Sequence, residues 1–405
     1  MKEIEFSTMF DTTASPGMGG AFFDAFSARH RLKVNARQIG WGEAWNKLVQ
    51  FGLSSRGPDI SEIGTTWLGS FETMEALRPF TPEEVASLGG NQCYPPGLWQ
   101  ACQMSQQQRM LAIPFTLDLR MVFYRRDWLQ KAGVDEATAF VDAEHFHETL
   151  SRVKAAGHPA PLGITTAHAH TDIVHDMTSW IWSAGGEIRS ADGKHMMLTL
   201  PQSRAGMEAY FGLNQFITPK MRGLTQQQVN KSFFEGQTAI AILKENNYLG
   251  YMGQGLKVSA EIAGNIGQAM LMRVPYLGGS ALVIWRQSMD YQAALKLVQF
   301  LTSTEAWRVL SKEVYSYTPA HLDALAHSPL AGIPFYPAIQ QSLKDGRSCY
   351  SGHRWSGVEI RLAETIEELW RDLYANPALN IAQEVESRFS ALCSRLEQTI
   401  LASSW

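Results

Sequence analysis

The densest group of chemically reactive side chains in this sequence lies between His168 and Asp176, in the order His-Ala-His-Thr-Asp-Ile-Val-His-Asp. Histidines and carboxylates ligate zinc, and a zinc site needs three or four of them to converge. The pattern predicts a polar loop up to His175 and a helix from Met177, with no cysteine nearby to add a ligand. A metal site is therefore weighed against a polar loop in which Asp172 stands near a helix N-terminus.

Other arrangements typical of enzymes are missing from the sequence. It contains neither the Gly-x-Ser-x-Gly of a hydrolase nucleophile nor the His-Glu-x-x-His of a zinc protease. The glycine-rich stretch Ser15 to Gly20 matches neither nucleotide-binding glycine pattern, and no lysine follows it. We interpret it as a loop leading into a helix, with Asp11 and Thr12 at its tip available to a small ligand. We predict no catalytic residue, no bound metal and no cofactor.

Length and composition indicate a folded chain of two domains. At 405 residues the chain exceeds the size at which one hydrophobic core usually stops growing. A content of 45% hydrophobic and 18% charged residues is typical of a globular protein. The net charge of −4 is small and the basic residues are scattered, so we expect no nucleic-acid partner.

The location is left open by the N-terminus and the cysteines. No run approaches the roughly 18 apolar residues that span a bilayer, and Met1 to Phe10 lacks a signal-peptide core. The protein is either cytoplasmic, or a mature exported form whose signal was replaced by an initiator Met. Among the four cysteines, Cys93 and Cys102 can pair in an exported protein or remain free thiols.

The first part of the chain alternates predicted strands and helices. Strands are expected at 4–8, 32–36 and 60–63, and helices at 22–29 and 41–53. This alternation predicts an open α/β domain with a largely parallel sheet. Such sheets bind ligands beyond the carboxyl ends of their strands.

The stretch from Ala112 to Gly133 changes character three times. An apolar entry leads to Asp118, a β-rich run follows at Met121 to Tyr124, and Asp127 is expected to cap a short helix, Trp128 to Ala132. The predicted order is strand, polar crossing, strand, helix. A carboxylate at such a junction is well placed for a ligand.

Four loose motifs occur in an order that resembles a known family. They are Trp41, Trp45 and Leu48 before Gly57-Pro58-Asp59-Ile60; Ile113-Pro114-Phe115 with Asp118 and Lys131-Ala132-Gly133; Phe233-Phe234-Glu235-Gly236 with Ala239; and Leu277-Gly278-Gly279 before the helix Ala293 to Glu305. Together they resemble the extracellular solute-binding proteins of family 1, the sugar-binding components of ABC importers, similar to maltose-binding protein. The resemblance runs from about residue 4 to 310 and more diffusely beyond.

The resemblance implies an α/β, two-lobed periplasmic-binding-protein (Venus-flytrap) fold of type II, with three hinge crossings. Ala112 to Gly133 would hold the first crossing, Tyr276 to Gly279 the second, and Tyr315 to Pro319 the third. The implied lobes are 1–115 plus 279–315, and 116–278 plus 316–405.

The types of the candidate residues also favour a carbohydrate site. A sugar offers hydroxyls that need carboxylates and amides, and C–H faces that need aromatic planes. Trp67 is alternatively a cover for the core, Asp118 a helix cap, and Trp355 a packing residue. The candidate ligand residues are Asp11, Thr12, Trp41, Thr65, Thr66, Trp67, Asp118, His175, Glu245, Asn246, Asn247, Gly278, Gly279 and Trp355.

The sequence also departs from the maltose-binding pattern. The region of Thr65 to Trp67 lacks an aromatic-plus-Asp-Arg arrangement, and Lys244 to Asn247 replaces an aromatic residue. A smaller or differently decorated sugar, or a polyol, is therefore expected in place of a maltodextrin.

The predicted function is binding without chemistry. The protein is expected to be a monomeric, periplasmic or extracellular, lipid- or membrane-associated component of an ABC importer. It would capture a carbohydrate between its lobes by hinge closure and present it to the permease transmembrane subunits. Two alternatives remain: a sensor that reports the ligand to a signalling partner, and a metal-dependent enzyme that uses the loop from His168 to His175.

Overall fold

The chain divides into two compact units. The computed structural model describes residues 1–10, 20–54, 56–104, 109–167, 171–253, 255, 257–313, 317–349, 352 and 354–401. Unit 1 comprises Met1–Asp118, Leu277–Tyr336 and Arg347–Ser356, and unit 2 comprises Leu119–Tyr276, Pro337–Gly346 and Gly357–Trp405. The stretch up to Tyr336 groups with unit 1, unlike in the division expected from the sequence, because β11 pairs with β6 at Thr318↔Leu117 and Pro319↔Thr116.

Unit 1 is built on a mixed sheet. β1 pairs in parallel with β2 over its whole length and with β3, whereas β10 runs antiparallel to β3. The sheet is therefore less parallel than expected, because β10 enters unit 1 directly from unit 2 and not through a βαβ crossover. The strands of unit 1 are β1 (Lys2–Thr8), β2 (Leu32–Gln38), β3 (Ile60–Gly64), β4 (Gln103–Met104), β5 (Arg109–Met110), the first part of β6 (Ile113–Arg125), β10 (Leu277–Ile284) and β11 (Thr318–Pro319).

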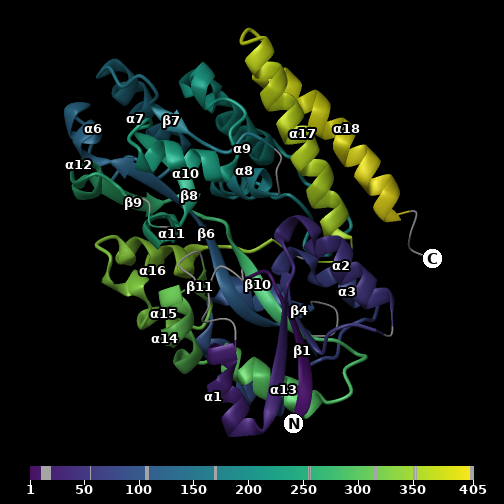
Figure 1. Cartoon of the computed structure of the whole chain (residues 1–405). Coiled ribbons are helices and arrows are strands. Elements are labelled where there is room, and N and C mark those ends of the chain that lie inside the picture. Colours follow the sequence, from purple (N-terminus) through teal and green to yellow (C-terminus); the bar gives the residue numbers. More distant parts are fainter. Residues whose placement is uncertain are drawn as a thin grey trace. The chain divides into compact units, whose positions relative to one another are not determined.

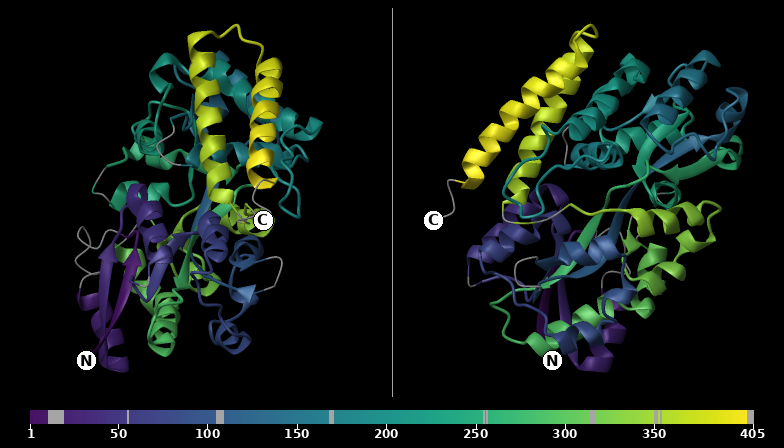
Figure 2. Two further views of the ribbon diagram at one scale, coloured as in Figure 1. Left: turned by 90° about the vertical axis from the view of Figure 1, so that its right-hand side faces the viewer. Right: turned by 180° about the vertical axis from the view of Figure 1, so that it is seen from behind.

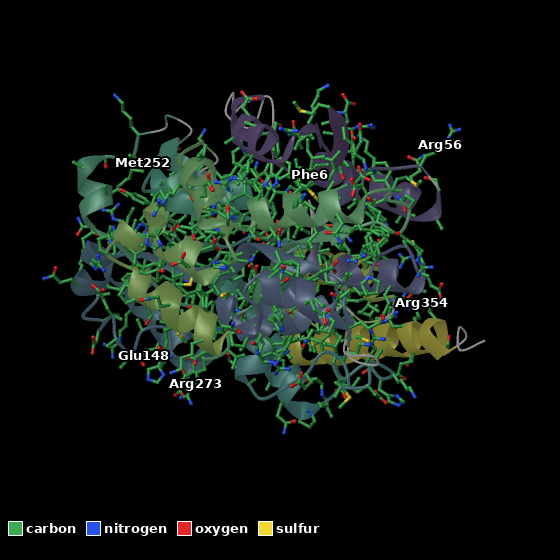
Figure 3. The ribbon with its side chains drawn as sticks, turned by 90° about the horizontal axis from the view of Figure 1, so that it is seen from below. Phe6, Arg56, Glu148, Met252, Arg273 and Arg354 are labelled. Atoms are coloured by element: carbon green, nitrogen blue, oxygen red, sulfur yellow. The ribbon has the colours of Figure 1, made fainter. Side chains whose placement is uncertain are left out.

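Helices complete unit 1, and their ends follow local rules. Asp290 caps α13, its carboxylate accepting from the backbone N–H of Ala293 at 3.0 Å. Phe6 of β1 is fully buried in the core, whereas Arg56 lies at the surface (Figure 3). The helices are α1 (Gly20–His30), α2 (Trp41–Leu53), α3 (Leu68–Thr73), α4 (Pro82–Ser87), α5 (Pro96–Cys102), α13 (Tyr291–Leu301), α14 (Thr304–Glu313) and α15 (Leu322–Ala326), with short 3₁₀ turns at Thr65–Trp67, Asn91–Cys93 and Pro329–Gly332.

In unit 2, the second part of β6 lies between two antiparallel strands, β8 and β9. β8 (Ile240–Lys244) pairs with it from Arg120↔Lys244 to Tyr124↔Ile240, β9 (Ile266–Met270) lies on the other side, and β7 (Leu162–Gly163) runs parallel to β8. The helices are α6 (Arg126–Lys131), α7 (Ala143–Ala155), α8 (Asp172–Ser183), α9 (Pro201–Phe211), α10 (Gln226–Phe234), α11 (Asn247–Gly253), α12 (Ala260–Gly264), α16 (Tyr336–Asp345), α17 (Trp355–Ala375) and α18 (Ile381–Leu401), with 3₁₀ turns at Gly212–Phe216 and Pro219–Met221.

The last two helices form a long hairpin in unit 2. α17 and α18 lie side by side in every view, and α18 packs on α9 (Figures 1 and 2). The inward residues of α17, Leu362, Ile366, Leu369 and Leu373, are fully buried. This apolar stripe, which the sequence shows at helical spacing, fixes α17 against the rest of unit 2.

Two local predictions were wrong. β6 is one continuous strand from Ile113 to Arg125, because the polar residues Thr116, Asp118 and Arg120 alternate with apolar ones and occupy a single face of the strand. Asp127 is not a cap either: it lies in the first turn of α6, and its carboxylate accepts from the Arg125 guanidinium at 2.9 and 2.6 Å.

A third prediction, the loop up to His175, was also wrong in part. α8 begins at Asp172, so His175 is helical. His168 and His170 lie outside the described residues. All four cysteines are free thiols, and burial raises the pKa of Cys102 well above its usual range. Within the described part of the chain, no helix combines the length and the hydropathy needed to cross a membrane.

Candidate functional site

Unit 1 brings two of the predicted tryptophans together. Trp41 opens α2 and Trp67 closes the turn after β3, and their ring centroids are 5.8 Å apart at an interplanar angle of 62°. Trp45, one helical turn after Trp41, also meets Trp67 edge to face at 5.8 Å. Trp67 is thus held between two indoles of one helix face. Trp41 is the outermost of the three, with 39% of its surface exposed.

A tyrosine that the sequence analysis missed completes this cluster. Tyr317 accepts a hydrogen bond from the Trp41 indole N–H at 3.3 Å and donates to the Met9 carbonyl at 3.1 Å. We call Trp41, Trp67 and Tyr317 the aromatic corner. Because Tyr317 lies some 250 residues beyond the two tryptophans, no local sequence pattern connects it to them. The corner offers an exposed aromatic plane beside the phenol oxygen of Tyr317, which suits the C–H face and the edge of a sugar.

Four other candidates of unit 1 have structural roles: Thr65, Thr66, Gly278 and Gly279. Thr65 and Thr66 are buried, and the Thr65 hydroxyl donates to the Gly279 carbonyl at 3.2 Å. Gly279 has φ +149°, and a Cβ there would stand 1.9 Å from the carbonyl oxygen of Thr116. Only glycine permits this approach of β10 to β6. Gly278 beside it is buried.

A buried carboxyl group, Glu62, supports the same end of unit 1. It accepts hydrogen bonds from the Thr8 hydroxyl at 2.7 Å and from the Met9 backbone N–H at 2.8 Å. Burial raises the pKa of Glu62 above its usual range, although hydrogen bonds from Ser280, Thr8 and Met9 oppose the shift. Glu62 thereby ties the end of β1 to β3. The signal was a lone glutamate in an otherwise uncharged strand, Ile-Ser-Glu-Ile-Gly.

Four further candidates of unit 1 remain to be placed. Asp11 and Thr12, predicted at the tip of the glycine loop, lie outside the described residues. Trp355 is only 2% exposed, which favours the packing interpretation over stacking on a ligand. Asp118 is half-buried on β6, on the strand face that also carries Thr116.

The candidates that follow β8 in unit 2 are engaged with the backbone. The Glu245 carboxylate accepts from the Leu119 backbone N–H at 2.9 Å. The backbone N–H of Glu245 donates to the Leu119 carbonyl at 3.1 Å. The Asn247 side chain accepts from the Lys244 N–H at 2.6 Å, at the start of α11. Asn246 is buried, with 3% of its surface exposed. These residues shape the turn after β8, and Glu245 holds it to β6.

A charged network lies beside this turn, centred on Arg120 of β6. Its guanidinium, fully buried, donates to Asp172 and, at 2.9 Å, to Gln226, and lies 3.6 Å from Asp176. Burial alone would raise the pKa of Asp172, but the charges of Arg120 and Lys244 outweigh it and hold this pKa well below its usual range.

His175 of α8 belongs to the same network. Its Nε2 lies 2.9 Å from Glu359 and its Nδ1 lies 3.4 Å from the Arg120 guanidinium. Both ring nitrogens therefore have protein partners, and only 9% of the residue is exposed. Of the side chains weighed for a metal site, Asp172 is engaged with Arg120 and His175 with Glu359, whereas His168 and His170 lie outside the described residues.

One crevice of unit 1 is too small for a sugar. It has a volume of about 50 Å³ and is lined in part by the ion pairs Arg109–Glu72 at 3.9 Å and Arg286–Glu75 at 3.1 Å. Ligand pockets are typically ~300–1,000 Å³. We therefore do not assign it to the ligand.

Comparison with known proteins identifies the class. The family described as bacterial extracellular solute-binding protein matches residues 21–337, and this chain belongs to that family. The resemblance predicted from the sequence motifs is thereby confirmed. The family is one of solute-binding proteins, not of enzymes, and its members act outside the cytoplasm. No curated protein sequence matches the chain.

Solved structures confirm the two-lobed fold. The sugar-binding protein MalE of Xanthomonas citri superposes with a TM-score of 0.81 at 19% identity, covering 100% of this chain and 98% of its own. An ABC-transporter solute-binding protein of Thermotoga lettingae, bound with α-D-tagatose, gives 0.79 at 16% identity, with 99% and 100% covered. One from Agrobacterium radiobacter, in complex with ribitol, gives 0.74 at 15%, with 98% of each chain covered.

Proposed function

We propose that this chain is the substrate-binding component of an ABC importer and that its ligand is a neutral carbohydrate: a monosaccharide, a small oligosaccharide or a polyol. The observation that carries the proposal is the aromatic corner, in which Trp41 presents an exposed indole beside the hydroxyl of Tyr317. Flat apolar surface next to polar edges is the combination that a sugar needs. The similar proteins of known structure that bind tagatose and ribitol support the same ligand class.

The charges of the candidate residues favour a neutral ligand. The candidate ligand residues include the carboxylates Asp118 and Glu245 but no lysine or arginine. The nearby Arg120 guanidinium already donates to Asp172 and Gln226. A sugar phosphate or sugar acid would thus be repelled by these carboxylates, whereas hydroxyl groups can donate to them.

The proposed mechanism is ligand binding without a chemical reaction of the ligand. The ligand is expected to stabilise a closed arrangement of the two units, because only a closed arrangement lets it contact both. The closed form would then dock on the permease transmembrane subunits, with the protein acting as a monomer. Lipid or membrane attachment outside the cytoplasm belongs to the same proposal.

A thermal-shift panel tests the ligand class. The panel contains hexoses, pentoses, disaccharides and polyols, each matched with a phosphorylated or carboxylated counterpart and run with and without EDTA. We expect at least one neutral member to raise the unfolding temperature, and its charged counterpart to leave it unchanged. A shift produced only by charged members, or one abolished by EDTA, would contradict the proposal.

The sensor alternative is distinguished by the partner. An importer component should stimulate the ATPase activity of permease subunits in vesicles when the carbohydrate is present. Stimulation of a signalling partner without any effect on a permease would favour the sensor.

A further inference from the structure

The chain passes between the units five times, after Asp118, Tyr276, Tyr336, Gly346 and Ser356. Three of these passages have unit 2 ends that are joined through one side chain. They follow Asp118, Tyr276 and Ser356. A hinge needs each connecting segment to be anchored in a rigid body, since a loose anchor would let the segments move independently. The unit 2 ends of all three passages meet at the imidazole of His175.

The first passage is anchored by Arg120, two residues after Asp118. The Arg120 guanidinium lies 3.4 Å from Nδ1 of His175 and donates to Asp172, and both partners are on α8. Asp176 of the same helix lies 3.6 Å away. The beginning of the passage in unit 2 is therefore fixed to one face of α8.

The second passage is anchored by Tyr276, the last residue of unit 2 before β10. Its ring stacks on the His175 imidazole with centroids 4.1 Å apart and planes inclined by 9°. Its backbone N–H donates to the Ser179 hydroxyl at 2.9 Å, and its carbonyl accepts from the Arg120 N–H at 3.2 Å. The first two passages are thus joined to each other as well as to α8.

The third passage is anchored by Glu359, three residues after Ser356 in α17. Glu359 is fully buried, and its Oε1 lies 2.9 Å from Nε2 of His175. A buried carboxylate needs such a partner, because an unpaired one would carry a large desolvation cost.

The two contacts determine how the imidazole is protonated. A guanidinium has only donors, so Nδ1 of His175 must accept from Arg120. A carboxylate accepts, so Nε2 of His175 must carry the hydrogen that it donates to Glu359. The neutral ring with hydrogen on Nε2 satisfies both partners, and its faces remain free for Tyr276 to stack on.

We propose that His175 is a positioning residue that couples the three passages within unit 2, and that it acts on ligand affinity through the hinge, not by touching the ligand. The proposal rests on the proposed function, because it assumes that ligand binding draws the units together. Loss of the anchor leaves more conformations to be ordered on binding, which weakens binding.

Two substitutions separate this role from others. His175→Leu fills the space but can neither donate nor accept. His175→Gln retains an acceptor toward Arg120 and a donor toward Glu359. Spin labels at Arg56→Cys in unit 1 and Glu148→Cys in unit 2, both exposed (Figure 3), report the distance between the units in a Cys93→Ser background.

We expect H175L to broaden the distance distribution of the ligand-free protein and to raise the Kd of the panel's best carbohydrate by roughly tenfold. H175Q should restore both values toward those of the unsubstituted protein. Should H175L not fold, Glu359→Leu removes the third anchor alone, and the same broadening is expected.

Three results would overturn the proposal. One is an unchanged ligand-free distribution in folded H175L, or in E359L if that variant has replaced it. Another is a raised Kd with an unchanged ligand-free distribution, which would make His175 a direct ligand contact. The third is a failure of H175Q to restore the distribution. If no carbohydrate binds the unsubstituted protein, the proposed function fails, whereas the ligand-free distributions still decide the anchor.

Discussion

The candidate residues of the two units differ in kind. Unit 1 offers aromatic rings, with Trp41 exposed and Tyr317 hydrogen-bonded to it. Unit 2 offers charged and amide groups that are mostly buried and already paired, as Arg120 is with Asp172. An exposed ring is free to meet a ligand, whereas a buried ion pair must first keep its own unit folded. Substitution of the exposed Trp41 should therefore affect affinity, and substitution of the buried Arg120 should affect stability.

The largest effect is expected from Arg120→Met. It leaves Asp172 and Asp176 buried without their cation, which should lower the free energy of unfolding by about 3–5 kcal/mol. Chemical denaturation measures the loss. Arg152→Met, which breaks an exposed pair with Glu148, serves as the control and should cost less than about 1 kcal/mol. Equal stabilities of the two variants would show that the buried network of unit 2 contributes no more than an exposed ion pair.

Asp118→Ala tests the carboxylate at the end of unit 1. If Asp118 holds ligand hydroxyls away from water, its loss should weaken binding by on the order of 2 kcal/mol, with little change in stability. Calorimetric titration gives the affinity, and Asp24→Ala on the exposed face of α1 is the control. Unchanged affinity would place Asp118 outside the site.

Trp41→Ala tests the aromatic corner. The loss of one stacking plane should raise the Kd of a carbohydrate roughly tenfold, about 1.4 kcal/mol. Trp128→Ala is a matched control, since Trp128 is a half-buried tryptophan of unit 2 that packs on Lys131. If both variants bind like the unsubstituted protein, the corner is not the sugar platform.

The smallest effect is expected from Glu62→Gln and appears as a pH dependence. Because burial raises the pKa of Glu62, the folded state favours the protonated acid, and its stability falls as the pH rises from the unfolded value of 4.5 through the raised value. Glutamine keeps the acceptor for Thr8 and Met9 without ionising. E62Q should be more stable than the unsubstituted protein at pH 8 and no more stable near pH 4. An equal difference in stability between E62Q and the unsubstituted protein at the two pH values would refute this prediction.

Local patterns in the sequence were sufficient for many elements of the fold. The helix Trp41–Leu53 occurs at the predicted residues, since apolar spacing is a local signal. The start of α8 was missed because its first turns are polar, although Asp172 and His175 are used there by partners distant in sequence. Long-range partners override local composition.

The candidate site was predictable only in part. Trp41 and Trp67 were proposed separately, and the fold brings them together. Tyr317 and Glu62 were missed because their roles depend on strand pairing and burial, which no local spacing encodes. Trp355 illustrates the reverse, a residue type suited to sugar binding that the fold buries.

A crystal structure of the protein with the panel's best carbohydrate tests the central claim most directly. The account predicts that a C–H face of the sugar lies on the Trp41 indole and that its hydroxyls donate to Asp118. A carbohydrate bound elsewhere, with Trp41 and Asp118 both free of it, would contradict the account.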